Sequence, residues 1–182
     1  MLQKCSLWQV AKVFFDEPTE QHYLKDVSRK ASLAPTSVKI HLENLEREKI
    51  ITSVKKLQGS RTFIFYQSAL NLDDSNYSFY RKLDVLERIH SMNLIGKIEH
   101  KLTPTTIVLF GSCASGEDTE SSDLDLFIQT SSKENFNPKP FEKLLKRKIQ
   151  FHTTKNLNDY PEELRNNIIN GIVLYGFLDP QA

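Results

Sequence analysis

The chain has little cysteine, no long hydrophobic run and almost no net charge. Its two cysteines, Cys5 and Cys113, lie far apart and in no pairing or metal-binding spacing, which favours free thiols in a reducing compartment over a disulfide framework. No apolar stretch reaches the roughly 18 residues that a membrane-spanning helix needs, and no basic-then-apolar leader is recognisable. We therefore expect a cytoplasmic protein without membrane insertion.

The formal charge of +1 conceals an asymmetry along the 182 residues. Residues 1–70 hold 11 Lys or Arg against 7 Asp or Glu, whereas residues 71–182 hold 13 against 16. A modestly basic N-terminal part is compatible with nucleic-acid binding but does not by itself establish it. The length allows one large domain or two small ones.

Residues 107–127, IVLFGSCASGEDTESSDLDLF, carry the most informative pattern. The apolar run 107–110 predicts a strand that is buried on both faces and ends at Gly111. Asp123 and Asp125 then alternate with apolar residues, so both carboxylates are expected on one face of a second strand while the leucines pack on the other.

Two neighbouring carboxylates repel each other, and a hard divalent cation relieves that repulsion. Mg²⁺ prefers a few carboxylate oxygens together with phosphates and water. Gly111 allows the backbone to approach a phosphate closely, and the hydroxyl of Ser112 and the amides of the turn can donate to it. The pattern therefore predicts a metal and nucleotide site, with Asp123 and Asp125 as metal ligands.

The segment resembles the signature of the DNA polymerase β-like nucleotidyltransferases: Gly111-Ser112, a ten-residue spacer from Cys113 to Ser122, and Asp-x-Asp. That spacing is similar to the minimal nucleotidyltransferase branch. The resemblance implies that Asp123 and Asp125 are catalytic and bind Mg²⁺ or Mn²⁺, and that Gly111 and Ser112 contact a nucleoside triphosphate, with ATP as the expected nucleotide. The plain alternative is a solvated pair of aspartates after an ordinary turn.

Two positions depart from the family. The third carboxylate, expected on the strand after the second helix, falls on Gln150, and no Asp or Glu occurs from 143 to 158. An amide brings no charge and cannot act as a base. Family members often read Gly-Ser-x-Ala-Arg-Gly, in which the arginine contacts phosphate, and this arginine is replaced by Ser115 here. Lys133 or a residue of the basic run 146–148 could supply the phosphate contact instead. Both changes are expected to lower catalytic activity more than they lower the stability of the fold. The sequence therefore does not decide whether the domain is an active enzyme.

His152 is a candidate replacement for the missing base. It lies two residues beyond Gln150, on the same face of the predicted strand but displaced about 7 Å along it. We therefore expect a histidine that is satisfied locally, although histidine as a residue type is a common base at neutral pH.

The N-terminal part predicts helices at 7–15 and 24–31 and a third helix through Lys49, with Thr36 or Ser37 as its N-cap. A hairpin then follows, with a turn at 58–60. This order resembles a winged helix-turn-helix domain. The resemblance implies that the third helix contacts the major groove of DNA through Thr36, Ser37, Lys39 and His41. It also implies that the hairpin, called the wing in this family, contacts phosphates through Lys55, Lys56 and Arg61.

A winged helix can also serve as a dimerisation module, and Glu43, Glu46 and Glu48 on the third helix would repel phosphate if they faced it. A long helix is expected from about Tyr77 to Leu102, ended by Pro104. Later elements are a helix opened by Pro140, strands at 149–153 and 172–175, and a helix at 161–170.

The sequence thus predicts an α+β protein of two domains. The expected parts are a winged helix-turn-helix domain at 1–72, a linking helix at 73–103, and a small mixed-sheet nucleotidyltransferase-like domain at 104–182. The leading hypothesis is a DNA-binding regulator that binds ATP with Mg²⁺ and transfers AMP to a hydroxyl of a protein or small molecule. The alternative is a catalytically degenerate domain that senses nucleotide, forms a homodimer, or binds a protein partner as antitoxins bind toxins of the HEPN type.

Overall fold

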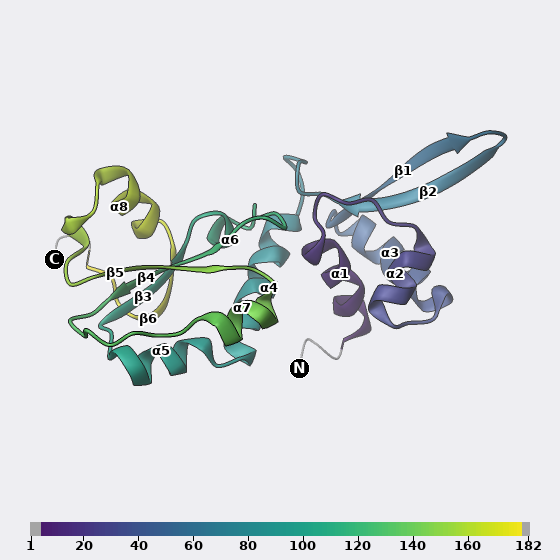
Figure 1. Cartoon of the computed structure of the whole chain (residues 1–182). Coiled ribbons are helices and arrows are strands. Elements are labelled where there is room, and N and C mark those ends of the chain that lie inside the picture. The colour runs from purple at the N-terminus through teal and green to yellow at the C-terminus, as the bar shows by residue number, and fades with distance from the viewer. Residues whose placement is uncertain (1–4, 180–182) are drawn as a thin grey trace. The chain divides into compact units, whose positions relative to one another are not determined.

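The computed structural model describes residues 5–179, apart from the side chain of Gln58, and shows a mixed α+β protein. The chain divides into two compact units, Met1–Asp84 and Val85–Ala182. Figure 1 shows helices and strands in both, with a two-stranded hairpin in the first unit and a four-stranded sheet in the second.

The N-terminal unit contains three helices followed by a hairpin, in the order that the sequence predicts. The helices are α1 (Ser6–Asp16), α2 (Leu24–Ala31) and α3 (Pro35–Arg47), and the antiparallel strands are β1 (Ile51–Gln58) and β2 (Arg61–Ser68). On α3 the buried residues Val38, Leu42 and Leu45 recur at helical spacing. They pack with α1 and α2 in a single apolar core.

The start and end of α3 differ from the expectation. Its N-cap is Ala34, and Pro35 occupies the first helical position, where a missing N–H and a fixed φ suit proline. Thr36 and Ser37 therefore lie in the first turn rather than at the cap. The helix ends at Arg47 because Lys49 adopts a positive φ of 56°, which is incompatible with a continuing helix.

The predicted long helix is two helices, α4 (Tyr77–Ser91) and α5 (Leu94–Leu102). Asn93 interrupts them in the left-handed conformation, with φ of 52° and ψ of 39°, which asparagine tolerates better than most residues. The buried face of α5 belongs to the core of the C-terminal unit. In the described part of the chain no helix is long and apolar enough to span a membrane.

The C-terminal unit is built on a sheet with the strand order β5-β4-β3-β6. Its strands are β3 (Thr106–Phe110), β4 (Leu124–Gln129), β5 (Ile149–Thr154) and β6 (Ile172–Gly176). β4 runs parallel to β5, whereas β3 is antiparallel to both β4 and β6. The sheet is therefore mixed, as predicted, and β3, one of its two inner strands, is buried along its whole length.

Helices cover both faces of this sheet. In Figure 1, α5 and α7 (Lys139–Leu145) lie on one face, and α8 (Glu162–Ile169) lies on the other. Leu124 and Leu126 of β4 point into the larger core beneath α5, while Phe127 packs with Ile168 of α8 in a smaller core. Because side chains alternate along a strand, Asp125 shares the α8 face with Phe127. This face carries the candidate site.

Candidate functional site

The turn after β3 requires glycine at its first position. Gly111 has φ of 71° and ψ of −160°, a conformation that residues with a Cβ rarely adopt. A Cβ atom here would lie 2.8 Å from Asp125 Oδ2. Gly111 therefore leaves room for the Asp125 carboxylate at the end of β3. Ser112 follows as the first residue of the short helix α6 (Ser112–Ser115).

Asp125 lies on β4 as the alternation predicts, opposite Phe110 of β3, whereas Asp123 lies just before that strand. Both side chains are half-buried. The Cys113 thiol donates to the backbone carbonyl of Asp123 over 3.3 Å. This bond holds the beginning of β4 against the turn, so that both aspartates and the Gly111-Ser112 turn occupy one end of the sheet.

The surroundings of Asp125 raise its pKa. Burial is the largest cause, because it disfavours the charged carboxylate; the His152 imidazole acts in the opposite direction, and the charge of Asp123 raises the pKa further. The repulsion between the two carboxylates is therefore present in the structure. It is the condition that a bound cation relieves.

Gln150 lies directly beside Asp125 in the parallel pairing of β4 with β5. Residues in register on adjacent strands share a face of the sheet, so the position expected for a third carboxylate holds an exposed amide. This amide can offer an oxygen ligand, but it brings no negative charge and does not accept a proton at neutral pH.

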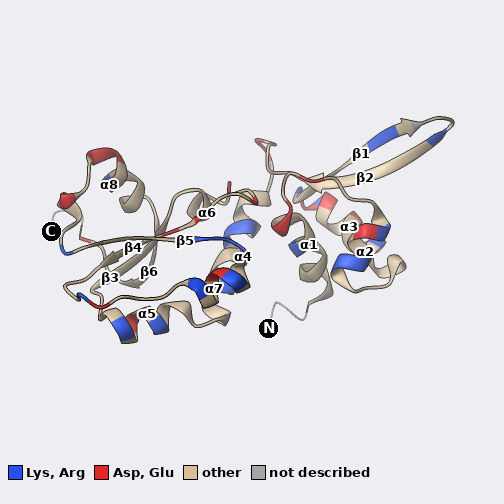
Figure 2. Cartoon of the chain, in the orientation of Figure 1, with Lys and Arg blue, Asp and Glu red and all other residues tan. Residues whose placement is uncertain are grey.

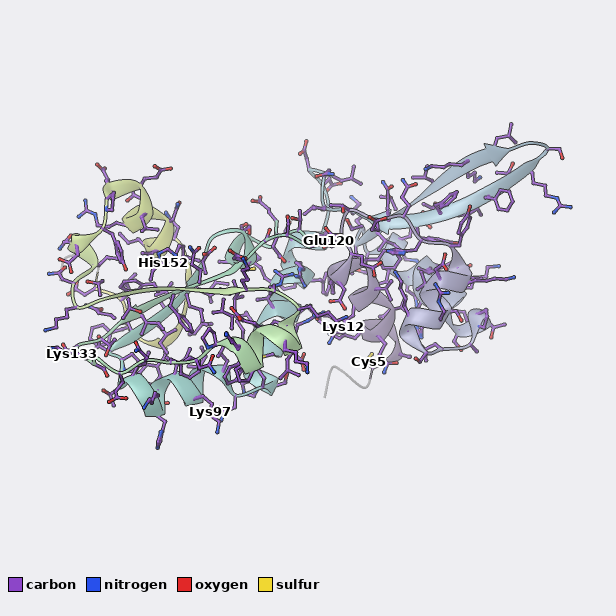
Figure 3. The ribbon with its side chains drawn as sticks, in the orientation of Figure 1. Cys5, Lys12, Lys97, Glu120, Lys133 and His152 are labelled. Atoms are coloured by element: carbon purple, nitrogen blue, oxygen red, sulfur yellow. The ribbon has the colours of Figure 1, made fainter. Side chains whose placement is uncertain are left out.

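His152 lies on β5, as Figure 3 shows, in register with Phe127 rather than with Asp125. Its imidazole nevertheless leans back along the strand, so that Nε2 lies 3.7 Å from Asp125 Oδ1. Nε2 is buried and has no hydrogen-bond partner. The prediction of a locally satisfied histidine, held away from the site by its place on the strand, is wrong because the side chain itself spans the offset.

Sequence reasoning missed a buried ion pair beneath the site. Arg147 Nη1 donates to Asp118 Oδ2 over 2.7 Å and to Cys113 Sγ over 3.2 Å. The Asp118 side chain is fully buried and that of Arg147 is 10% exposed. The pair ties the loop before Asp123 to the chain entering β5. The partners lie 29 residues apart, and no local pattern of the sequence joins them.

The lysines considered as replacements for the family's arginine occupy different places. Lys133 follows the C-terminal end of β4 (Figure 3), whereas Asp123 precedes its N-terminal end, so the strand separates them. Lys148 directly precedes β5, and its carbonyl accepts a hydrogen bond from the Leu124 amide. Lys148 is therefore the neighbour of Asp123 across the sheet and is better placed for a phosphate contact.

Comparison with known proteins points to the same part of the chain. Residues 92–177 match the family model described as Polymerase beta, Nucleotidyltransferase. The match spans all four strands of the sheet, the Gly111 turn and both aspartates. This part of the chain is therefore similar to a nucleotidyltransferase domain.

Among solved structures, the chain is similar to one titled "Possible transcriptional regulator from Methanosarcina mazei Go1". The aligned part is 22% identical, covers 37% of this chain and 62% of that one, and has a TM-score of 0.32. That score is too low to support a conclusion about fold or function. No curated protein matches the chain.

Nucleotidyltransferase domains generally use divalent metal ions. Among residues 5–179, no three His, Cys, Asp or Glu side chains lie close enough to hold an ion by themselves. In the C-terminal unit, Asp123 and Asp125 could supply carboxylate oxygens, and Nε2 of His152, which has no hydrogen-bond partner, lies 3.7 Å from Asp125 Oδ1. This donor set fits an ion whose remaining ligands are phosphate oxygens and water.

Most residues expected to contact DNA are exposed in the N-terminal unit. Thr36, Ser37 and Lys39 lie on the surface of α3, and Lys55 and Arg61 on the hairpin, whose basic segments are blue in Figure 2. Two predicted residues are engaged or covered by the protein itself. The Lys56 ammonium lies 5.0 Å from the centre of the Phe65 ring, and His41 is half-buried with its Nδ1 enclosed.

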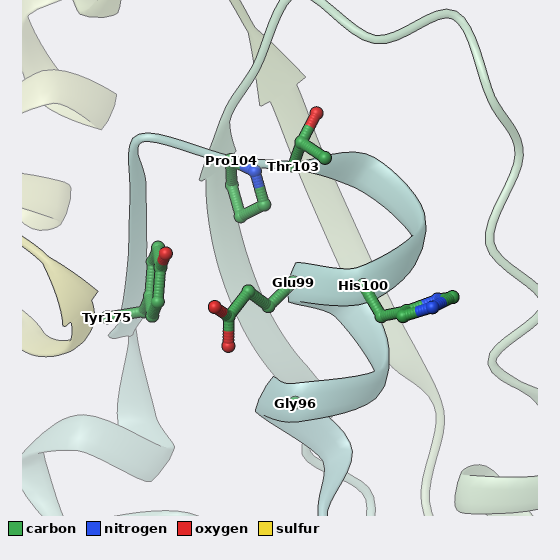
Figure 4. Close-up of a pocket in the computed structure, with 6 residues that line it drawn as sticks. All are labelled: Gly96, Glu99, His100, Thr103, Pro104 and Tyr175. Atoms are coloured by element: carbon green, nitrogen blue, oxygen red, sulfur yellow. The ribbon is translucent and has the colours of Figure 1, made fainter.

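A pocket of ≈ 580 Å³ lies at the other end of β3, between α5 and β6. Figure 4 shows its lining, formed by Gly96, Glu99, His100, Thr103, Pro104 and Tyr175. Pro104 and Thr103 precede β3, whereas Gly111 follows it, so the length of the strand separates this pocket from the aspartates. None of the predicted site residues lines it.

Proposed function

We propose that the chain is a DNA-binding regulator whose nucleotidyltransferase-like domain binds ATP together with Mg²⁺ or Mn²⁺. One observation carries the nucleotide part: Asp125 on β4 and Asp123 just before it lie beside the Gly111 turn, within the segment that matches the family model. In this proposal the two carboxylates hold the cation. Gly111 and Ser112 contact the phosphates, and Lys148 supplies a positive charge next to them.

The reaction proposed for this site is transfer of AMP to a hydroxyl of a protein or small molecule. A bond forms between the acceptor oxygen and the α-phosphorus, the bond to the leaving pyrophosphate breaks, and the hydroxyl gives up its proton to water. A bound divalent cation neutralises charge on the phosphates. Gln150 occupies the position where a carboxylate could accept the proton of the hydroxyl, and its amide cannot accept that proton. We therefore expect transfer to be slow.

Gln150→Asp is expected to raise AMP transfer by about 100-fold or more, the usual contribution of a positioned general base. The measurement follows the labelled α-phosphate of ATP into lysate proteins and small acceptors, with wild type and Gln150→Asp in parallel. Gln129→Asp provides the matched control, because Gln129 lies at the opposite end of β4. If all three proteins bind ATP but transfer equally small amounts of AMP, the domain is a nucleotide sensor and not an enzyme.

The DNA-binding part of the proposal rests on a surface in the N-terminal unit. Helix α3 exposes Thr36, Ser37 and Lys39, and the side chain of Ile40 beside them is 58% exposed. Polar and basic groups with an adjacent apolar side chain suit a major groove, where thymine methyl groups offer apolar contacts. Glu46 of the same helix is engaged by the Ser53 hydroxyl, which donates to it over 2.6 Å. This contact directs one of the three glutamates toward the hairpin.

Lys39→Ala and Lys55→Ala are each expected to weaken binding to double-stranded DNA and to lower the salt dependence of binding by about one unit of log–log slope. Fluorescence anisotropy with genomic DNA fragments, measured from low to physiological salt, tests this. Lys97→Ala is the control, since Lys97 is an exposed lysine of α5 in the other unit (Figure 3). Absence of DNA binding at low salt would leave the three helices and hairpin as a protein-binding or dimerisation module.

A further inference from the structure

The position of His152 is not explained by packing alone. Its ring lies against two aromatic residues, with centroid distances of 5.0 Å to Phe110 and 6.3 Å to Tyr160. These contacts fix the imidazole on the face that carries Asp125, and they leave the buried Nε2 directed at that carboxylate without a hydrogen bond. A buried, unbonded imidazole nitrogen is costly unless a partner satisfies it.

The separation of the two side chains suits a shared ion. Nε2 of His152 and Oδ1 of Asp125 lie 3.7 Å apart, which is too long for a hydrogen bond. With bonds near 2.1 Å, two adjacent ligands are about 3.4 Å apart around a tetrahedral ion and about 3.0 Å apart around an octahedral one. A small side-chain adjustment would therefore allow one cation to contact both atoms.

We propose that His152 is a ligand of the divalent cation held by Asp125, and that the site consequently selects a transition-metal ion such as Mn²⁺ or Co²⁺ over Mg²⁺. This inference rests on the proposed nucleotide site. It follows from donor chemistry: Mg²⁺ prefers oxygen ligands, whereas the affinity of a site with a nitrogen donor rises along the first transition series, from Mn²⁺ to the stronger binder Co²⁺. Because β5 carries an amide at Gln150 in place of a carboxylate, His152 is the residue of β5 that supplies a strong metal ligand.

The ion is expected to bind with the nucleotide rather than alone. No trio of His, Cys, Asp and Glu side chains in the described residues surrounds a common point, so the protein supplies too few ligands for tight binding of a free cation. The triphosphate oxygens complete the coordination. Binding should therefore be measured with ATP present, using Mn²⁺ and Mg²⁺ in separate experiments.

The direct test is pulsed electron paramagnetic resonance of Mn²⁺ with ATP and the protein, with histidine isotopically labelled so that its nitrogen is distinguished from that of adenine. Wild type is expected to show coupling to a histidine nitrogen, and His152→Ala to lose it. In His152→Ala the affinity for Mn²⁺ with ATP should fall by at least roughly 10–100-fold, the loss seen when a metal ligand loses a supporting partner. The affinity for Mg²⁺ with ATP should fall less. His100→Ala, which changes an exposed histidine of α5, should retain both.

His152→Asp provides a second variant with the opposite expectation, because a carboxylate returns an oxygen donor. It should bind Mg²⁺ with ATP at least as well as wild type while losing the preference for Mn²⁺. An unchanged histidine coupling and Mn²⁺ preference in His152→Ala would overturn the inference and leave the nucleotide site intact. No binding of either metal with ATP to wild type would overturn the proposed function together with it.

Discussion

Replacing Gly111 with alanine is expected to weaken the binding of ATP with Mn²⁺ by about 10–100-fold, as when a metal ligand loses its positioning partner. The added Cβ would meet Asp125 Oδ2 at 2.8 Å, so the carboxylate must turn away from the site. The backbone conformation of Gly111, with φ of 71° and ψ of −160°, adds a strain of about 1–3 kcal/mol for any residue with a side chain. Isothermal titration calorimetry measures the affinity.

Gly59→Ala separates these two effects. Gly59, at the tip of the hairpin, also has a positive φ, of 63°, but a Cβ there meets nothing within 4 Å. This variant carries backbone strain without touching the site, so we expect its affinity for ATP with Mn²⁺ to equal that of wild type. Equal affinity in a folded Gly111→Ala protein would show that the Asp125 carboxylate does not need the space that the glycine provides.

Arg147→Met is expected to lower the free energy of unfolding of the C-terminal unit by roughly 3–5 kcal/mol, the cost of removing one partner of a buried ion pair. The Asp118 side chain is completely buried and accepts a hydrogen bond from Arg147 over 2.7 Å. Without the guanidinium, the buried carboxylate loses a charged partner, and the loop before Asp123 loses its tie to the chain entering β5. Nucleotide binding should weaken in parallel, because this loop positions the site.

Urea unfolding followed by far-ultraviolet circular dichroism measures this loss. The single tryptophan, Trp8, lies in the core of the N-terminal unit, and its fluorescence reports that unit separately. The double variant Asp118→Ala with Arg147→Met should regain a large part of the stability, since removing both charges removes the desolvation cost. A loss below about 1 kcal/mol in Arg147→Met would mean that the pair behaves like an exposed one.

The parts of the fold that the sequence predicts are those specified by local patterns. The apolar run 107–110 and the alternation around Asp123 and Asp125 reflect the two-residue period of a strand, and both strands form as expected. The break at Asn93 was missed because the apolar residues on either side keep a helical spacing. One residue in the left-handed conformation divides the segment, and a periodic pattern is insensitive to that.

The side-chain geometry of the site could not be predicted in the same way. The approach of His152 to Asp125 depends on which way an imidazole leans between Phe110 and Tyr160, which the strand period does not determine. The pairing of Asp118 with Arg147 depends on a loop folding over the sheet. Both are long-range contacts whose partners become neighbours only after β4 and β5 pair.

The most direct test of the metal and nucleotide site is a calorimetric titration of ATP into wild type and Asp123→Ala, with Mn²⁺, with Mg²⁺ and with neither. Asp73→Ala, at an exposed position of the N-terminal unit, serves as the control. We predict binding by wild type and Asp73→Ala that requires a divalent cation, and none by a folded Asp123→Ala protein. Binding that ignores the cation or survives Asp123→Ala, or no binding by wild type, would contradict the account.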